Sequence, residues 1–511
     1  MIAVLDTKGI VASEEFTMKV QHISAMQLME RAAQACTAEV QKRYPISDLV
    51  VVAGKGNNGG DGVAMARLLL AEGRNVRVFR VLANGMPSEQ NRSNFDAARA
   101  AGVRCLDLDE IDSLDLSGDE VVIDALLGNG CYRSPSGLLA RVIDRINAHA
   151  GAVISIDMPS GLPTVAGVLP DDHKVVVADL VLTLGAVKPT LLFPEFARFV
   201  KHWVFVPLGF EIPPDVPGSR MRMLETNDIA AMLMERSRTG HKGTFGHALM
   251  VAGGRGHMGA AVLATRAALR SGCGLVTTHV PAGGAQVIHI TSPEAMCRED
   301  ASDAVSEVSM DQRYDAVGIG PGMGTGTGTA RVIGDLLAAQ QRNCVLDADA
   351  LNVLAQESEL KRLLHPGVVL TPHPGEFDRL AGTPSASAKE RLRRAMDLAR
   401  THSCVLVLKG AYTAICTAEG NVLFNTTGNC GMAKGGAGDA LTGLITGLLA
   451  QGYPPLEATV VGVHLHGLAG DLAARNMGPD GMTITDLIDH IPLAWQHLRA
   501  VQKRSSTEPL P

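Results

Sequence analysis

Short apolar runs alternate with helix-like stretches through the first half of the chain. Residues 63–72 and 89–101 repeat their apolar positions at helical spacing. The runs around them are rich in Val, Ile and Leu, and they lie at 48–54, 74–82, 119–127, 152–159 and 178–185. Buried strands that alternate with helices are typical of a parallel sheet with helices on both faces. We therefore predict a Rossmann-like, doubly wound α/β domain.

The same alternation starts again in the second half, after a break in the pattern. Residues 207–220 hold four prolines and two glycines and predict a linker. Helical spacing returns at 259–272 and 387–402. Further strands are predicted at 247–254, 274–281, 314–322, 343–351, 367–376, 404–415 and 421–426. No fixed period relates the two halves, so we predict two different α/β domains fused in one chain, at residues 1–215 and 222–503.

Composition and charge argue against nucleic-acid-binding and membrane proteins. The formal net charge is −7, so we expect no basic face for nucleic acid or for an anionic membrane. The apolar stretch 175–192 is interrupted by Asp179 and Lys188, and we expect no membrane span. The nine cysteines are odd in number and show no C-x-x-C spacing, which favours free thiols in a reducing compartment. These features predict a cytoplasmic globular protein.

A glycine-rich loop, GKGNNGGDG, follows the first predicted strand at 54–62. Its glycines permit strained turns and close backbone approach, and Asn57 and Asn58 tolerate left-handed conformations. We expect the next helix to begin near Asp61, so that its N-terminus faces an anion. The alternative is a tight turn in which Asp61 only caps the helix. The whole nine-residue string favours a phosphate-binding loop.

Polar groups also follow two other predicted strands of this half. Asp124 ends one strand and precedes a flexible loop at 128–134, whereas Asp157 and Ser160 follow another strand. Ligands of open α/β sheets bind at the carboxyl ends of the strands. A single Asp at such a place can also be a simple cap. Together with the glycine-rich loop, these groups predict one shared site.

A second glycine-rich string, GGAGDALTGLITGLL, begins at residue 435. Backbone N–H groups at 437–439 can form an anion hole at the start of an apolar helix, and Asp439 can remove a proton from an attacking hydroxyl. His373 lies between prolines at a predicted strand end, which favours a site over a core position. His464 and His466 lie in an apolar helical stretch, and we interpret both as structural.

The first half resembles the NAD(P)H-hydrate epimerase family over residues 1–215. The resemblance depends on GKGNNGGDG, DALLG, SIDMPSG and GAVKP, in this order along the chain. It implies that a potassium ion is bound by Asn58, Asp124 and Ser160, and that Asp157 transfers a proton at the hydroxylated carbon, with Lys188 as the runner-up. It also implies contacts to the phosphates and ribose of the substrate from Asn57, Asn58, Gly59, Gly60, Asp61, Gly128, Asn129, Gly130, Cys131, Tyr132, Arg133 and Ser134.

The second half resembles the ribokinase-like superfamily and, within it, the ADP- or ATP-dependent NAD(P)H-hydrate dehydratases. The match covers about residues 222–500 and includes HKGTFG, TPHPGE, KGAYT and GAGD. The resemblance implies that magnesium accompanies the nucleotide phosphates. The implied contacts to the hydrate are Ala260, Gly322, His373 and Asp439. The implied contacts to the adenine nucleotide are Lys409, Gly410, Ala411, Tyr412, Thr413 and Gly438.

Both resemblances imply one substrate, hydrated NADH or NADPH. The first domain would interconvert the R and S hydrates, and the second would dehydrate the S form with ADP, which we favour, or with ATP. One alternative is a ribokinase-like small-molecule kinase with a non-catalytic N-terminal binding domain. Another is a nucleotide-sensing scaffold without turnover. We expect small-molecule ligands, no nucleic acid or membrane partner, and a homo-oligomer in which helical residues 16–43 form the interface.

Overall fold

The chain folds into two compact units, one made mainly of residues 2–221 and the other mainly of residues 222–511. A computed structural model describes residues 1–83, 85–116, 118–214, 216, 220–310, 313–339 and 343–507. Part of the predicted linker, residues 215 and 217–219, lies outside the described residues. Among the described residues, no helix is long and apolar enough to cross a membrane.

The N-terminal unit is built on a parallel sheet with the strand order β4-β3-β2-β5-β6-β7-β8. The predicted strands are present as β2 (Leu49–Ala53), β3 (Val76–Val81), β5 (Val121–Ala125), β6 (Val153–Ile156) and β7 (Ala178–Leu184). The sequence pattern missed β1 (Ile2–Ala3), β4 (Arg104–Leu108) and β8 (Val200–Val206). β4 and β8 are the sheet edges and partly exposed, so they lack the continuous apolar run of a central strand.

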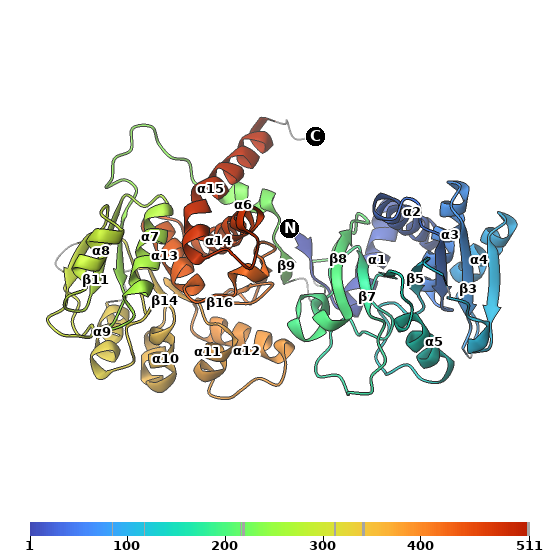
Figure 1. The fold of residues 1–511 in the computed structure, drawn as a ribbon, viewed down its shortest axis with the longest axis horizontal. Helices are drawn as coiled ribbons and strands as arrows, with labels where there is room; N and C mark the ends of the chain where they lie inside the picture. Colours follow the sequence, from blue (N-terminus) through green and yellow to red (C-terminus); the bar gives the residue numbers. More distant parts are fainter. Residues whose placement is uncertain are drawn as a thin grey trace. The chain divides into compact units, whose positions relative to one another are not determined.

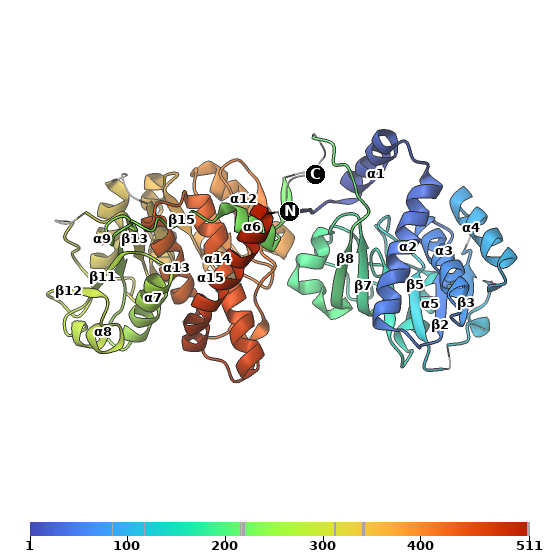
Figure 2. The same ribbon diagram turned by 90° about the horizontal axis from the view of Figure 1, so that it is seen from above.

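Helices cover both faces of this sheet (Figures 1 and 2). In β2, Leu49, Val51 and Ala53 pack into the core shared with one helical layer, whereas Val50 and Val52 pack into the core of the opposite face. The first layer contains α2 (Ala25–Arg43), α3 (Asn57–Ala71) and α4 (Glu89–Ala100), and the second contains α5 (Gly137–Asn147). Helix α1 (Thr7–Gln21) precedes them. The doubly wound α/β prediction is confirmed for this unit.

The C-terminal unit contains a second, mainly parallel sheet. From β9 onward its strand order is β9-β18-β17-β16-β15-β14-β13-β10-β11-β12. Its strands are β9 (Met221–Met223), β10 (His247–Val251), β11 (Leu275–Val280), β12 (Met296–Glu299), β13 (Ala316–Ile319), β14 (Asn343–Leu346), β15 (Val368–Leu370), β16 (Val405–Leu408), β17 (Ala414–Cys416) and β18 (Val422–Phe424). The single strand predicted at 404–415 is wrong, because the chain reverses after residue 408 and β17 runs antiparallel to β16.

Helices again lie on both faces of this sheet (Figure 1). One face carries α7 (Met258–Arg270), α13 (Ala437–Ala450), α14 (Pro455–Met477) and α15 (Ile484–Thr507). The other face carries α9 (Thr327–Ala338), α10 (Asp349–Gln356), α11 (Pro374–Leu380) and α12 (Ala388–Thr401), and α6 (Thr226–Met232) and α8 (Ala285–Thr291) complete the unit. The α/β prediction is therefore confirmed for this unit as well.

Helix α13 is the centre of the second core. Its residues from Ala440 to Ala450 are buried on every side, between the sheet and the helices α7 and α14. A helix that is apolar all round is stable only inside such a core. On α14, burial lowers the pKa of His464 to about 4, and burial likewise lowers that of His466 to about 4. Both histidines are buried, as the structural interpretation predicts.

Candidate active sites

A cavity of about 550 Å³ opens in the N-terminal unit. It lies where β2, β5 and β6 end, and these strands are neighbours in register. Of the predicted site residues, the cavity is lined by Asn57, Asn58, Asp61, Gly128, Asn129, Gly130, Cys131 and Asp157. Gly59, Gly60, Tyr132, Arg133 and Ser134 do not line it. The carboxyl edge of the sheet thus brings all three predicted segments to one cavity.

The glycines of the first loop serve close packing, which differs from the predicted strained turns. Helix α3 begins at Asn57 and not near Asp61, and none of the glycines in 54–62 has a positive φ. A Cβ atom on Gly59 would overlap the carbonyl oxygen of Gly54, and one on Gly60 would lie 3.0 Å from the sulfur of Met29. The buried Gly59 lets α3 lie directly against the strand end, and the buried Gly60 lets α3 approach α2. Asn57 and Asn58 consequently form the first turn of a helix.

Asp157 and Lys188 form a buried ion pair beside the cavity. Asp157 follows β6 directly and has a φ of 67°, a left-handed conformation that a residue with a side chain adopts at a cost. Its Oδ1 atom accepts hydrogen bonds from the ammonium of Lys188 and from the N–H of Leu184. Lys188 is fully buried, and its Nζ atom also donates to the Leu184 carbonyl at 2.9 Å. The ion pair fixes the carboxylate where it faces the cavity.

Asp124 and Ser160 do not line this cavity, but Ser160 accepts a hydrogen bond from the N–H of Leu127, which does. The fully buried Asp124 accepts the hydroxyl of Ser160 at 2.5 Å, its N–H at 2.9 Å and the hydroxyl of Ser155 at 2.7 Å. Burial raises the pKa of Asp124, against the effect of these hydrogen bonds. Both polar atoms of the Asn58 amide are buried and have no hydrogen-bond partner within the described part of the chain. A Cβ atom on Gly128 would lie 3.0 Å from that of Asn58.

The cavity holds an acidic group that sequence reasoning missed. Glu14, from α1, lines it together with Asp61 and Asp157. Burial and then the charge of Asp157 raise the pKa of Glu14 to about 7, whereas Lys188 lowers it. Burial and the charges of Asp157 and Glu14 also raise the pKa of Asp61 well above its usual range. The helical spacing of Ile10, Glu14 and Met18 is the sequence signal that could have marked it, although the predicted helical stretch began only at residue 16.

The second candidate site lies at the N-terminus of α13. Gly436 precedes the helix with a φ of 96°, and Asp439 lies in the first turn. The first N–H groups of a helix have no partner within it and attract anions. Burial and then the charge of Asp347 raise the pKa of Asp439 to about 6, whereas Lys409 lowers it. With a pKa of about 6, most of the Asp439 carboxyl is ionised at neutral pH.

Charged residues from three strand ends surround this helix start. The Nζ atom of Lys409, after β16, donates to Oδ1 of Asp347, after β14, at 2.8 Å and lies 3.7 Å from Glu376. Thr442, on α13, donates to Oδ2 of Asp347 at 2.9 Å. Burial lowers the pKa of the Lys409 ammonium, but the charges of Asp347 and Glu376 raise it overall. Sequence reasoning did not assign Asp347 or Glu376 to the site, although both lie in the later parts of the predicted strands 343–351 and 367–376.

Two predicted hydrate contacts lie side by side, and a third has a capping role. A Cβ atom on Gly322, whose φ is 66°, would lie 3.2 Å from the Cβ of Ala260. His373 is half exposed and caps α11, because its Nδ1 atom accepts the N–H groups of Gly375 at 3.0 Å and of Glu376 at 3.3 Å. His373 is thus outside the core, as predicted, and its ring is held by the helix that it caps.

The predicted nucleotide contacts 409–413 form the turn between β16 and β17. Within this turn, the Thr413 hydroxyl donates to the carbonyl of Gly410 at 3.1 Å, and Gly410 and Ala411 are exposed. A Cβ atom on Gly438 would lie 3.2 Å from Nζ of Lys409 and 3.2 Å from Oδ2 of Asp347. The structure therefore brings Gly438 next to Lys409, and the turn that contains Tyr412 is partly exposed.

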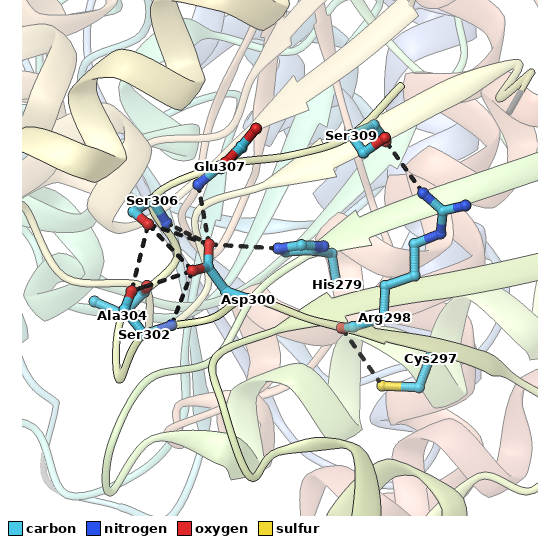
Figure 3. Close-up of polar contacts among 9 residues, drawn as sticks. All are labelled: His279, Cys297, Arg298, Asp300, Ser302, Ala304, Ser306, Glu307 and Ser309. Atoms are coloured by element: carbon cyan, nitrogen blue, oxygen red, sulfur yellow. Dashed lines mark hydrogen bonds and ion pairs between the residues drawn. The ribbon is translucent and has the colours of Figure 1, made fainter. Parts of the chain in front are cut away.

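A further polar cluster fixes a loop at the end of β12 (Figure 3). Asp300 accepts the N–H groups of Ser306 at 2.7 Å, Glu307 at 2.9 Å and Ser302 at 3.1 Å, and its Oδ2 atom lies 3.7 Å from Nε2 of His279. Burial opposes ionisation of Asp300, but these N–H groups hold its pKa below the usual range. The hydrogen bonds to Asp300 order the loop after β12.

The comparisons with known proteins cover both units. Residues 25–190 match the family described as YjeF-related protein N-terminus, and residues 248–493 match the family described as NAD(P)H-hydrate dehydratase. The bifunctional NAD(P)H-hydrate repair enzyme of Moorella thermoacetica is 35% identical over 93% of this chain and 93% of its own. The enzyme of that name from Escherichia coli is 32% identical over 91% of this chain and 88% of its own.

One similar solved structure spans the second unit. It is the ADP/ATP-dependent NAD(P)H-hydrate dehydratase of Bacillus subtilis, which was co-crystallised with ATP and Mg²⁺. It is 32% identical, with a TM-score of 0.48, and the alignment covers 54% of this chain and 97% of that one.

Proposed function

The chain belongs to the family of bifunctional NAD(P)H-hydrate repair enzymes, and on that premise we propose that it restores hydrated NADH and NADPH at two separate sites. The N-terminal domain, residues 1–215, epimerises the R and S hydrates. The C-terminal domain, residues 222–503, dehydrates the S hydrate with an adenine nucleotide. One acidic residue in each unit carries the proposal. Asp157 directly follows a strand of the N-terminal unit, and Asp439 lies in the first turn of a helix of the C-terminal unit.

Dehydration takes place at the N-terminus of α13. Asp439 accepts the proton of the hydrate hydroxyl while its oxygen attacks the terminal phosphoryl group of the nucleotide. The backbone N–H groups of the first helical turn and Lys409 stabilise the negative charge that develops. The phosphate ester then leaves with its C–O bond electrons, pushed out by the lone pair of the ring nitrogen. Loss of a proton from the neighbouring carbon restores the nicotinamide, and ADP yields AMP and phosphate.

Nucleotide binding requires a divalent cation, and the acidic residues near Lys409 fit one. Among the described residues, no group of three His, Cys, Asp or Glu side chains is arranged to hold a metal ion. Mg²⁺ commonly binds through one or two carboxylates together with substrate phosphates and water. The oxygens of Asp347 and Glu376, both buried beside Lys409, are suitable donors of this kind. Bound Mg²⁺ would neutralise phosphate charge during phosphoryl transfer.

Epimerisation takes place in the cavity of the N-terminal unit. Asp157 transfers a proton at the hydroxylated carbon, and the ion pair with Lys188 holds its carboxylate in place. A potassium ion fits beside it, because the buried oxygen of the Asn58 amide has no hydrogen-bond partner among the described residues. Asp124 and Ser160 are hydrogen-bonded to each other next to Leu127, which lines the same cavity as Asn58. Neutral and singly charged oxygens suit this weakly hydrated cation. The ion would help to hold the substrate phosphates at the N-terminus of α3.

The remaining site residues are assigned from the family resemblance given above. We assign Asn57, Asp61 and the loop 128–134 to the hydrate in the epimerase site, and Ala260, Gly322 and His373 to the hydrate in the dehydratase site. We assign the turn 409–413 and Gly438 to the adenine nucleotide. We favour ADP as the co-substrate, because this chain resembles the fused bacterial form of the family.

Assembly and location complete the proposal. The exposed apolar residues Val11, Val20 and Met26 lie on α1 and α2, at exposed fractions of 43%, 47% and 37%. Contact of these helices between two copies would cover them, which supports a homo-oligomer through residues 16–43. The unpaired cysteines support a cytoplasmic location. Light scattering of the purified chain tests the assembly, and a monomer at micromolar concentration would contradict it.

A single assay tests the function. The purified chain is incubated with a mixture of R and S hydrates and with ADP or ATP, while the absorbance of reduced nicotinamide is followed. The proposal predicts recovery of the whole mixture and release of AMP from ADP. A stable phosphorylated product would instead indicate a small-molecule kinase, and the absence of turnover would indicate a nucleotide-sensing protein.

A further inference from the structure

Helix α1 places one acidic side chain on an otherwise apolar face. Ile10, Glu14 and Met18 lie four residues apart, and all three line the cavity of the N-terminal unit. An acid at this position is not required for packing, because an aliphatic side chain would fill the same space without the cost of removing a carboxylate from water. Glu14 therefore calls for a chemical explanation.

The surroundings of Glu14 offer it no counterion of its own. Within the described part of the chain, its carboxylate has no hydrogen bond or ion pair, and the nearby ammonium of Lys188 is already bound to Asp157 and to the Leu184 carbonyl. The charged or titratable groups that face it or lie beside it are Glu15, Lys55, Asp61, Cys131, Asp157 and Lys188. Burial and the charge of Asp157 raise the pKa of Glu14 to about 7, so a sizeable fraction is protonated at neutral pH.

We propose that Glu14 is a second proton-transfer residue of the epimerase site, which protonates the hydroxyl of the hydrate so that it leaves as water. The inference rests on the proposed epimerase function. Inversion at one carbon by loss and return of water needs a donor for the departing oxygen and an acceptor for the arriving water. Asp157, paired with the ammonium of Lys188, suits the acceptor role, and Glu14, which has no such partner among the described residues, suits the donor role.

The steps balance without an additional reactant. Glu14 gives its proton to the hydroxyl oxygen, the C–O bond breaks, and water departs. The lone pair of the ring nitrogen forms a C=N bond at the same carbon, which leaves a planar cation. Water then adds to the other face, the nitrogen recovers its electron pair, and Asp157 takes the proton that the water loses. Passage of that proton from Asp157 to Glu14 restores the site. The carboxylates of the cavity stabilise the cation.

The test uses the full chain without nucleotide, so that no dehydration occurs. Exchange between the separated S and R hydrates of NADH is followed by chromatography from about pH 5.5 to 8.5, with the uncatalysed rate subtracted. For the wild type, the rate should fall as the pH rises through about 7, because the donor form of Glu14 is lost. Glu14→Gln should lower the rate by about 100-fold or more and remove this limb. Glu15→Gln, an exposed neighbour on the same helix, should behave as the wild type.

A second readout does not depend on any variant. In water enriched with ¹⁸O, each wild-type inversion should introduce one labelled oxygen into the hydrate. Inversion without label would overturn the inference, as would a Glu14→Gln chain whose rate stays within about threefold of the wild type with the same pH limb. A wild type that does not interconvert the epimers would instead refute the proposed epimerase function, so the two failures are distinguishable.

Discussion

The two glycine-rich loops look alike in the sequence but meet different physical needs. In the first, Gly59 lies against the carbonyl of Gly54, and none of the glycines in 54–62 has a positive φ. In the second, Gly436 has a φ of 96°, and Gly438 leaves room beside Asp347 and Lys409. The first loop uses glycine to bring a helix against the sheet, whereas the second turns the chain and opens a helix N-terminus to a ligand. The presence of glycines in the sequence does not by itself show which of these two roles a loop has.

The two sites also differ in the charged groups that they contain. The first cavity is lined by three acidic residues, Glu14, Asp61 and Asp157, and by Lys55, and the buried Lys188 is paired with Asp157. Its excess of acidic groups favours a bound cation or a cationic intermediate. The second site places Lys409 and a helix N-terminus next to its carboxylates, so it favours a polyphosphate with its cation. The difference agrees with isomerisation at the first site and phosphoryl transfer at the second.

The largest expected effect separates the two chemistries. Asp439→Ala removes the proton acceptor at the start of α13, and dehydration should fall by about 1,000-fold or more. Exchange between the R and S hydrates should stay at the wild-type rate, because Asp439 belongs to the other unit. Absorbance recovery and chromatography on the same preparation measure both. Loss of both activities in a folded variant would show that the sites are coupled.

The reciprocal variant, Asp157→Asn, should remove most of the epimer exchange. The amide cannot accept a proton and leaves the ammonium of Lys188 buried without its partner, so we expect a loss of about 100- to 10,000-fold. Dehydration of purified S hydrate should be unchanged. Epimer exchange at the wild-type rate would reject the role of Asp157, and Lys188→Met would then test the runner-up.

The glycine comparison predicts a difference in stability. Gly59→Ala forces a Cβ atom into the Gly54 carbonyl and should lower the free energy of unfolding of the N-terminal unit by about 3 kcal/mol. Gly435→Ala is the matched control, since no atom lies within 4 Å of its added Cβ and its φ is not positive. It should change the stability by about 0.5 kcal/mol or less. Equal effects in urea unfolding would contradict the packing role of the first loop.

The smallest predicted effect is a pH dependence of dehydration. Asp439 accepts a proton only when it is ionised, and burial raises its pKa to about 6. The rate of dehydration of the S hydrate should therefore fall as the pH drops below about 6, by about tenfold per unit. Epimer exchange should not fall with acid in this range, because Glu14 gains its proton there. Parallel pH profiles for the two activities would contradict the assignment.

The central strands and the positions of the two sites could be predicted, because short stretches of the sequence mark them. Runs of Val and Ile mark strands buried on both faces, and the polar residue after each run marks the carboxyl edge. The edge strand β4 escaped prediction because only one of its five residues is buried. Glu14 escaped because its role depends on a cavity built by residues more than a hundred positions away. Asp347 shows the same limit, since its partner Lys409 lies 62 residues further along.

The central claim is that two independent sites in one chain act on the same damaged coenzyme. The most direct test supplies a mixture of R and S hydrates with ADP to the wild type, Asp157→Asn and Asp439→Ala, and follows the return of reduced-nicotinamide absorbance. The account predicts full return for the wild type, return of only the S fraction beyond the spontaneous rate for Asp157→Asn, and no return with continued epimer exchange for Asp439→Ala. Loss of both activities in either folded variant would contradict it.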